Sequence, residues 1–518
     1  MGKQICKLVV LFLILNANAF AQEFVNLDVI HEIKTEAFEN SQVMETLGYL
    51  ADVYGPRLAG SPSYRAAAQW ACDKLEQWGL EKAELESWGV FGRGWSFDKV
   101  SLEMIQPNYM PIIAYPRAWT SGTNGVITGT PVLLDISSEE DLEQYRDSLK
   151  TKIVMIGQPN EIELKFEADA KRYSEEDLQE LAKAPMPGEI SEWQARRDKY
   201  RERYRLFKKM VQFAKEEGAE LSLIPGRRQD GTVLVYGGES YKLNSVKDPP
   251  SLVVAVEQYG RLCRLLEKNI QVELKAEIKT SFYQDDSLGY NVIAEIPGND
   301  RNLKNEIVML GAHLDSWHAG TGATDNACGC AVVMEAVRIL KAIHIKPRRT
   351  IRIALWDGEE EEYFGSRGYI KKHFGDANTM QLKPEHENFS VYFNIDNGAG
   401  KIRGIYLQND DAARPIFEAW LRPFHDLGAT TVTIRETTGT DHIPFNEIGL
   451  PAFQFIQDEL DYDTRTHHTN MDVYEHVLPG DVMQSSAIMA SFVYHAAMRD
   501  EKIPRKPLPA KKELNESD

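Results

Sequence analysis

The sequence predicts an α/β fold in which a mostly parallel, mixed central sheet is flanked by helices. Seven apolar segments of strand length follow residue 288 and alternate with helical segments; they are residues 291–296, 306–310, 350–356, 390–395, 405–408, 431–435 and 452–456. Residues 326–344 carry Val333, Val337 and Leu340 on one helical face, as expected of a helix that crosses between parallel strands. This alternation is typical of a sheet with helices on its faces.

A second, β-rich region is inserted ahead of that layer. Between residues 114 and 283, short apolar runs are separated by charged segments; the runs are residues 131–134, 152–156, 221–225 and 251–256. Residues 161–217 are dense in Glu, Lys and Arg, with aromatic residues and leucines at helical intervals, which predicts a charged helical excursion. We therefore expect residues 22–113 and 284–500 to form one domain, residues 114–283 an insert in it, and residues 501–518 a disordered tail.

The charge balance limits the classes of partner, and the N-terminus indicates the location of the protein. The 518-residue chain has 59 basic and 78 acidic side chains, a formal net charge of -19, which argues against nucleic acid or an anionic membrane as the main partner. Residues 1–21 combine Lys3 and Lys7 with an apolar run and the small residues Ala19 and Ala21, a pattern typical of a signal peptide cleaved after Ala21. No later run approaches the roughly 20 apolar residues of a membrane span. We expect a secreted or periplasmic protein.

Four cysteines follow the signal peptide, too few for a disulfide scaffold in a chain of this size. Two of them form the pattern Cys328-Gly-Cys330, which on its own could belong to a metal or redox site. The apolar helical run behind this pattern favours small, buried helix residues instead.

Acidic residues and histidines follow the carboxyl ends of three predicted strands; they are His313, Asp315, Glu359, Glu360 and Asp396. The strands of an open α/β sheet deliver such residues to one crevice. Two further candidates are Asp325, where a Gly-rich loop enters the predicted helix, and His468, in a loop after the last strand. Two imidazoles and several carboxylates form the mixed nitrogen and oxygen set that suits zinc or a similar divalent ion.

Five motifs in order give the sequence a recognisable pattern. They are Gly311-Ala-His-Leu-Asp-Ser-Trp, Gly322-Ala-Thr-Asp-Asn, Trp356-Asp-Gly-Glu-Glu-Glu-Glu-Tyr-Phe-Gly-Ser, Asn394-Ile-Asp-Asn-Gly and His468-Thr-Asn-Met-Asp. The pattern resembles the co-catalytic di-zinc exopeptidases of the aminopeptidase and glutamate carboxypeptidase family, and among them the plasma glutamate carboxypeptidase type. The resemblance implies the zinc exopeptidase fold, and residues 114–283 resemble the protease-associated domain that some members carry as an insert.

The resemblance also implies a ligand set for two metal ions, expected to be zinc. His313 and Asp396 would bind one ion, Glu360 and His468 would bind the other, and Asp325 would bridge the two. Members of the family often have a cis peptide after the bridging aspartate, which would fall at Asp325–Asn326 here.

The remaining catalytic roles are implied in the same way. Glu359 would be the general base, and Asp315 would hydrogen-bond a ligand imidazole and fix its orientation. Many members place a tyrosine where this chain has Thr437, so His442 becomes the candidate for stabilising the oxyanion, against the alternative of a structural histidine. His318 fits a structural or substrate-lining role better than a ligand role, and His467 has no assigned role.

The leading hypothesis is a metallo-exopeptidase that acts on short peptides or dipeptides. Aminopeptidase and carboxypeptidase activities share this metal centre, so the terminus attacked stays open, as does a homodimer. Two alternatives on the same fold are a glutaminyl cyclase, which uses one zinc ion, and a binding module that has lost ligands. The retained ligand set disfavours both. We also expect the insert to lie beside the catalytic crevice, with the excursion at 161–217 restricting access to short peptides.

Overall fold

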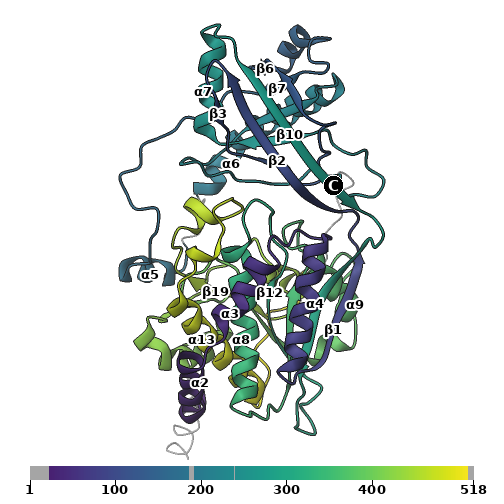
Figure 1. Cartoon of the computed structure of the whole chain (residues 1–518). Coiled ribbons are helices and arrows are strands. Elements are labelled where there is room, and N and C mark those ends of the chain that lie inside the picture. The colour runs from purple at the N-terminus through teal and green to yellow at the C-terminus, as the bar shows by residue number, and fades with distance from the viewer. Residues whose placement is uncertain (1–22, 186–191, 239, 511–518) are drawn as a thin grey trace, which may run out of the picture.

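The computed structural model describes residues 23–185, 192–238 and 240–510 (Figure 1). Its largest sheet has eight strands, in the order β1 (Glu81–Val90), β11 (Leu288–Ile296), β13 (Thr350–Trp356), β12 (Ile307–His313), β16 (Phe389–Asn394), β19 (Ala452–Gln457), β17 (Ile402–Tyr406) and β18 (Thr431–Thr433). At its centre β12 pairs in parallel with β13 and β16, and β16 pairs in parallel with β19. Strand β11 is antiparallel to both neighbours. The predicted mixed sheet with a parallel centre is confirmed.

Helices cover both faces of this sheet. One face packs against α2 (Leu27–Glu39), α3 (Val43–Gly48), α4 (Pro62–Gln77), α8 (Cys328–Ala342) and α13 (Pro479–Met498). The other packs against α9 (Phe364–His373) and α12 (His442–Glu447). Every residue of β12 is buried, as expected of a strand covered on both faces. Cys328 and Cys330 are buried, free thiols in α8, which confirms that they are packing residues.

The inserted region, together with residues 94–111 that precede it, forms two further sheets above the main body (Figure 1). One contains β3 (Met110–Pro111), β2 (Gly94–Gln106), β10 (Glu273–Tyr283) and β5 (Ile127–Gly129); the other contains β4 (Ala114–Pro116), β9 (Ser251–Val254), β8 (Leu221–Pro225), β7 (Ile153–Ile156) and β6 (Pro131–Leu134). The helix α7 (Val256–Glu267) packs on β8 and β9. The long β2–β10 ribbon joins these sheets to the main body.

The charged segment expected at 161–217 contains two helices that lie apart. Helix α5 (Glu175–Ala182) lies beside the main body at the end of a long connection, and α6 (Glu192–Glu216) lies near the inserted sheets (Figure 1). Helix α5 is amphipathic and buries Leu178. Its neighbour in space is β18 of the central sheet.

The tail differs from the prediction over the residues that are described. Ile503 is buried in the main core, and the guanidinium of Arg505 donates to the carbonyl oxygens of His386 and Phe389. These contacts hold the chain as far as about residue 506, so the disorder expected from residue 501 is wrong there. Residues 511–518 and the predicted signal peptide lie outside the described residues. Within the described part of the chain, no helix is long and apolar enough to cross a membrane.

Candidate metal centre

Three of the predicted ligands meet at the carboxyl ends of the central strands. His313 ends β12, Asp396 follows β16, and Asp325 lies in the turn that leads into α8. The Nε2 atom of His313 lies 3.2 Å from Asp396 Oδ1 and 3.2 Å from Asp325 Oδ1. The peptide bond Asp325–Asn326 is cis, as the family resemblance implies.

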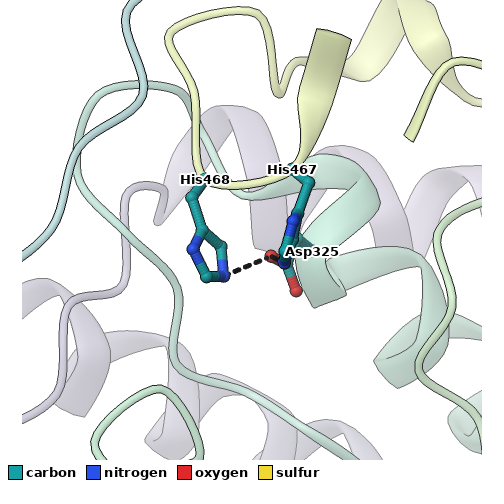
Figure 2. A group of neighbouring side chains, drawn as sticks. All are labelled: Asp325, His467 and His468. Atoms are coloured by element: carbon teal, nitrogen blue, oxygen red, sulfur yellow. Dashed lines mark ion pairs between the residues drawn. The ribbon is translucent and has the colours of Figure 1, made fainter. Parts of the chain in front are cut away.

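Asp325 also reaches the second pair of predicted ligands. Its Oδ2 atom lies 3.3 Å from His468 Nε2, which is in turn 2.9 Å from Glu360 Oε2. Figure 2 shows the imidazoles of His467 and His468 directed at the Asp325 carboxylate from the same loop. His467 Nε2 is 3.9 Å from Asp325 Oδ2, a proximity that the sequence analysis missed because nothing in the motif distinguishes two adjacent histidines. The structure thus brings all five predicted ligands together around one carboxylate.

The hydrogen bonds of this cluster favour a cation at its centre. The Nδ1–H of His313 donates to the main-chain oxygen of Asp315 at 3.0 Å, so the Nε2 lone pair faces two carboxylates. Among the described residues, the buried atoms Asp325 Oδ2 and Glu360 Oε1 have no hydrogen-bond partner. Buried polar atoms are normally paired, and a set of imidazole nitrogens and carboxylate oxygens matches what zinc prefers. The residues therefore fit a pair of divalent ions.

The pKa values of the cluster show the same shortage of positive charge. Burial, reinforced by the nearby Asp325, raises the pKa of Glu360 well above its ordinary value. Burial alone would lower the pKa of His313, but the carboxylates of Asp396 and Glu359 raise it well above the ordinary value. The acidic cluster therefore favours any added cation, whether a proton or a metal ion.

Asp315 lies where the sequence places it but makes a different contact. Its carboxylate is 3.6 Å from His313 Nδ1, while its main-chain oxygen accepts the imidazole hydrogen bond. The carboxylate oxygens accept instead from the backbone N–H groups of Glu359 and Glu360, both at 3.2 Å. Asp315 therefore fixes the turn that carries the two glutamates. Glu359 is buried, and burial raises the pKa of its carboxyl well above the ordinary value.

His442 and His318 are both committed to main-chain oxygens. The Nε2–H of His442 donates to Thr437 at 3.1 Å, and its buried Nδ1 has no partner among the described residues. Burial lowers the pKa of His442 to about 4, so the ring is neutral and has no second N–H to offer an oxyanion. The contacts favour the structural alternative for His442. The Nε2–H of His318 donates to Pro116 at 2.7 Å and its ring lies edge-on to Trp95, in agreement with a structural role.

Two aromatic side chains beside the ligands were not foreseen. The ring of Tyr462 lies 4.7 Å from that of His467, and burial followed by the charge of Asp325 raises the pKa of its phenol well above the ordinary value. The ring of Trp317 lies 5.9 Å from that of His468. Trp317 closes the first of the five motifs, but neither its contact with His468 nor that of Tyr462 with His467 can be predicted from the sequence, because the orientation of loop aromatics depends on tertiary contacts.

The loop that carries His468 is held by the inserted region. The backbone N–H of Val235 donates to the oxygen of His468 at 2.9 Å, and Leu234 forms a β-bridge with Thr469. Next to this bridge, the N–H of Asn470 donates to the Val233 oxygen at 3.2 Å. A short piece of β-pairing therefore fixes the ligand loop from one side.

A second part of the inserted region holds the turn that precedes the loop. Lys171 and Leu460 exchange two backbone hydrogen bonds of 2.9 and 2.8 Å. The guanidinium of Arg172 lies 2.7 Å from Asp458, whose side chain is fully buried, and 2.8 Å from Asp481. A buried carboxylate needs such a partner. Both ends of the segment 458–470 are thus anchored to inserted residues.

Comparison with known proteins finds a family and several relatives that this chain resembles. Residues 291–493 match the family described as peptidase family M28. Over 501 residues the chain is 24% identical to mouse carboxypeptidase Q (Mus musculus), covering 95% of this chain and 92% of that protein. A peptidase M28 precursor from Shewanella amazonensis superposes with a TM-score of 0.66 at 25% identity, covering 93% of this chain and 99% of the other. A zinc aminopeptidase from Bacillus subtilis shares the fold, with a TM-score of 0.55 at 18% identity, over 89% of this chain and 95% of that one.

Residues 291–493 therefore resemble the peptidase M28 family, and the protein is a metallopeptidase. The resemblance predicted from the five motifs, including that to the carboxypeptidase Q type, is confirmed. The matched region spans all five predicted ligands.

Proposed function

We propose that the protein is a secreted or periplasmic di-zinc exopeptidase that hydrolyses short peptides or dipeptides. The observation that carries the proposal is the shared carboxylate of Asp325, which lies 3.2 Å from His313 on one side and 3.3 Å from His468 on the other. His313 and Asp396 would hold one zinc ion and Glu360 and His468 the other, with Asp325 between them. Relatives named carboxypeptidase Q, and a neighbour named as a zinc aminopeptidase, support this reading.

Each protein group has a part in the proposed reaction. Two divalent ions in this site would activate a water molecule and polarise the scissile carbonyl. Glu359 would accept the proton of that water and pass it to the leaving amine, a role suited to a carboxyl whose pKa is raised by burial. Asp315 would keep Glu359 and Glu360 in place through the backbone N–H groups that it accepts from.

The proposal extends to the organisation of the chain. We infer that residues 1–21 are a cleaved signal peptide and that residues 114–283 form a protease-associated-like insert. Segments of the insert contact the loop of His468. An insert beside the site would restrict access to short peptides, which supports exopeptidase action. A folded protein added as substrate should be left intact, and internal cleavage of it would contradict this part of the proposal.

Metal analysis tests the class of protein. Two zinc ions per chain are expected, whereas one would favour a glutaminyl cyclase and none a binding module. A peptide-library digest read by mass spectrometry then shows whether residues leave from the amino or the carboxyl terminus. The proposal fails if the metal-loaded protein releases no terminal residue from any peptide in the library.

A further inference from the structure

A basic pocket lies in the inserted region, outside the metal centre. It has a volume of about 710 Å³ and lies between α6 and the segment formed by residues 236–238. Five cationic side chains line it; they are Arg117, Arg205, Lys208, Lys209 and Lys215. The acidic residue in its lining, Asp248, is paired with Lys215 at 2.8 Å, and Lys209 lies 3.5 Å from Glu139 outside the lining. The pocket therefore has a clear excess of positive charge in a protein whose formal net charge is -19.

Arg117 is the cation with the most constrained setting. Its guanidinium donates to the main-chain oxygen of Gly237 at 2.8 Å and lies over the ring of Tyr236, 5.1 Å from the ring centre. Among the described residues, its buried Nε atom has no hydrogen-bond partner. A fixed guanidinium with an unused N–H is suited to planar or tetrahedral oxyanions.

A hydroxyl completes the polar lining. Ser251, the first residue of β9, is 4% exposed, and its Oγ has no hydrogen-bond partner among the described residues. Buried hydroxyls are normally satisfied. Together with Arg117 it offers a donor pair in a cationic cavity, which is the chemistry of an anion site rather than of a packing defect.

The pocket shares a wall with the loop that follows His313. Pro116, next to Arg117, accepts the hydrogen bond of His318 at 2.7 Å. A Cβ atom on Gly237 would lie 3.3 Å from the ring of Trp317, which in turn packs against His468. A ligand in the pocket would therefore lie directly behind the catalytic loop.

We propose that this pocket binds the carboxylate of a small peptide or amino acid. The cations, the unpartnered Nε of Arg117 and the unpartnered hydroxyl of Ser251 all select an oxyanion, and hydrolysis of a peptide bond produces a carboxylate at every turnover. Inorganic phosphate has the same recognition chemistry and is the other source of such an anion. The inference does not depend on which terminus the enzyme attacks or on the number of metal ions.

Calorimetric titration of the metal-loaded full chain tests the proposal. The probes are N-acetylglycine, its neutral analogue N-acetylglycinamide, and inorganic phosphate. N-acetylglycine should bind and the amide should not. Arg117→Met should weaken N-acetylglycine binding by about tenfold or more, because a charge-assisted contact is lost. Arg227→Met is the matched control, since Arg227 lies over the same Tyr236 ring at 5.6 Å but does not line the pocket.

Metal content is measured for each variant, so that binding at the metal centre is not mistaken for binding in the pocket. Equal affinities for wild type and Arg117→Met would overturn the proposal, as would loss of binding on metal removal alone. Binding of phosphate without N-acetylglycine would also overturn the assignment to a carboxylate. If Arg117→Met does not fold, Ser251→Ala removes the hydroxyl without adding bulk and is expected to weaken binding in the same direction.

Discussion

The two halves of the candidate metal centre, His313 with Asp396 and Glu360 with His468, are supported in different ways. His313 ends β12 and Asp396 follows the neighbouring parallel strand β16, and their side chains are only 1% and 7% exposed. His468 comes from a loop, has a left-handed backbone with φ 60°, and its side chain is 27% exposed. The central sheet therefore positions His313 and Asp396, and the turn held by Asp315 positions Glu360. Only His468 depends on contacts with the inserted region.

This difference assigns a structural task to the insert. The β-bridge at Leu234 and Thr469 and the ion pairs of Arg172 fix the two ends of the segment 458–470. Ligand geometry depends on the groups around the ligands as much as on the ligands themselves. We expect changes in the insert to affect the His468 half of the centre and to leave the His313 half intact.

The largest loss of metal and activity is expected from substitution of Asp325, the carboxylate that lies between the two halves. Asp325→Ala should cost both metal ions and all measurable activity, because the carboxylate would neutralise part of the charge of both dications, which would otherwise repel each other. His468→Ala should mainly weaken one ion. Metal analysis after gel filtration checks both variants, and two tightly held ions in Asp325→Ala would refute the bridging role.

Glu359→Gln should separate chemistry from metal binding. The variant keeps the side-chain size and the backbone N–H that donates to Asp315, so both halves should keep their ions. Turnover should fall by about 100-fold or more, as expected when a general base is removed. Steady-state kinetics with parallel metal analysis is the measurement. A metal-replete variant with near-normal turnover would show that Glu359 is not the base.

The comparison also explains which parts of the site could be predicted from the sequence. His313, Glu360 and Asp396 follow buried strands, and the ends of parallel strands meet at one edge of a sheet, so their proximity follows from the pattern. The contacts that hold the loop of His468 could not be predicted, because the residues that make them lie far away in the chain. Val235 contacts the loop through its backbone N–H, and Arg172 contacts Asp458 through an ion pair. No local periodicity records such contacts.

The sequence also cannot show which atoms of a site residue form its hydrogen bonds. The sequence places Asp315 two residues after His313, but it cannot show that the main-chain oxygen, not the carboxylate, accepts from the imidazole. It likewise cannot show that the Nε2–H of His442 is used by Thr437. The long strand β10 was also absent from the prediction, since its alternating charged residues do not form an apolar run.

Arg172→Met should test the dependence on the insert directly. Asp458 would keep its contacts with Arg403 at 2.8 Å and with the backbone N–H of Tyr173 at 3.0 Å, so the fold should survive. Affinity for one of the two ions should fall by about tenfold, as is usual when a group that orients a ligand is lost. Competition with a chelator measures this.

Arg146→Met, which removes an exposed insert arginine paired with Glu143, is the control and should leave both affinities unchanged. Equal loss of both ions in Arg172→Met would show that the two halves are not supported separately. Unchanged affinities would show that the β-bridge alone is sufficient to hold the loop.

The smallest expected effect is a pH dependence of the same loop. His476 Nδ1 lies 2.8 Å from Asp461, at the start of the turn before His467, and this hydrogen bond raises the pKa of His476 above its ordinary value. A raised folded-state pKa means that the stabilisation is complete below the unfolded value of about 6.5 and is lost as the pH rises through the higher folded-state pKa. Because the pair is partly exposed, the loss should be small.

Hydrogen exchange tests this dependence. Exchange of the amides of residues 461–468, corrected for intrinsic rates, should increase modestly across that pH range in wild type and stay flat in His476→Gln. His425→Gln, on an exposed histidine elsewhere, should behave like wild type. An identical rise in His476→Gln would show that this pair does not hold the ligand loop.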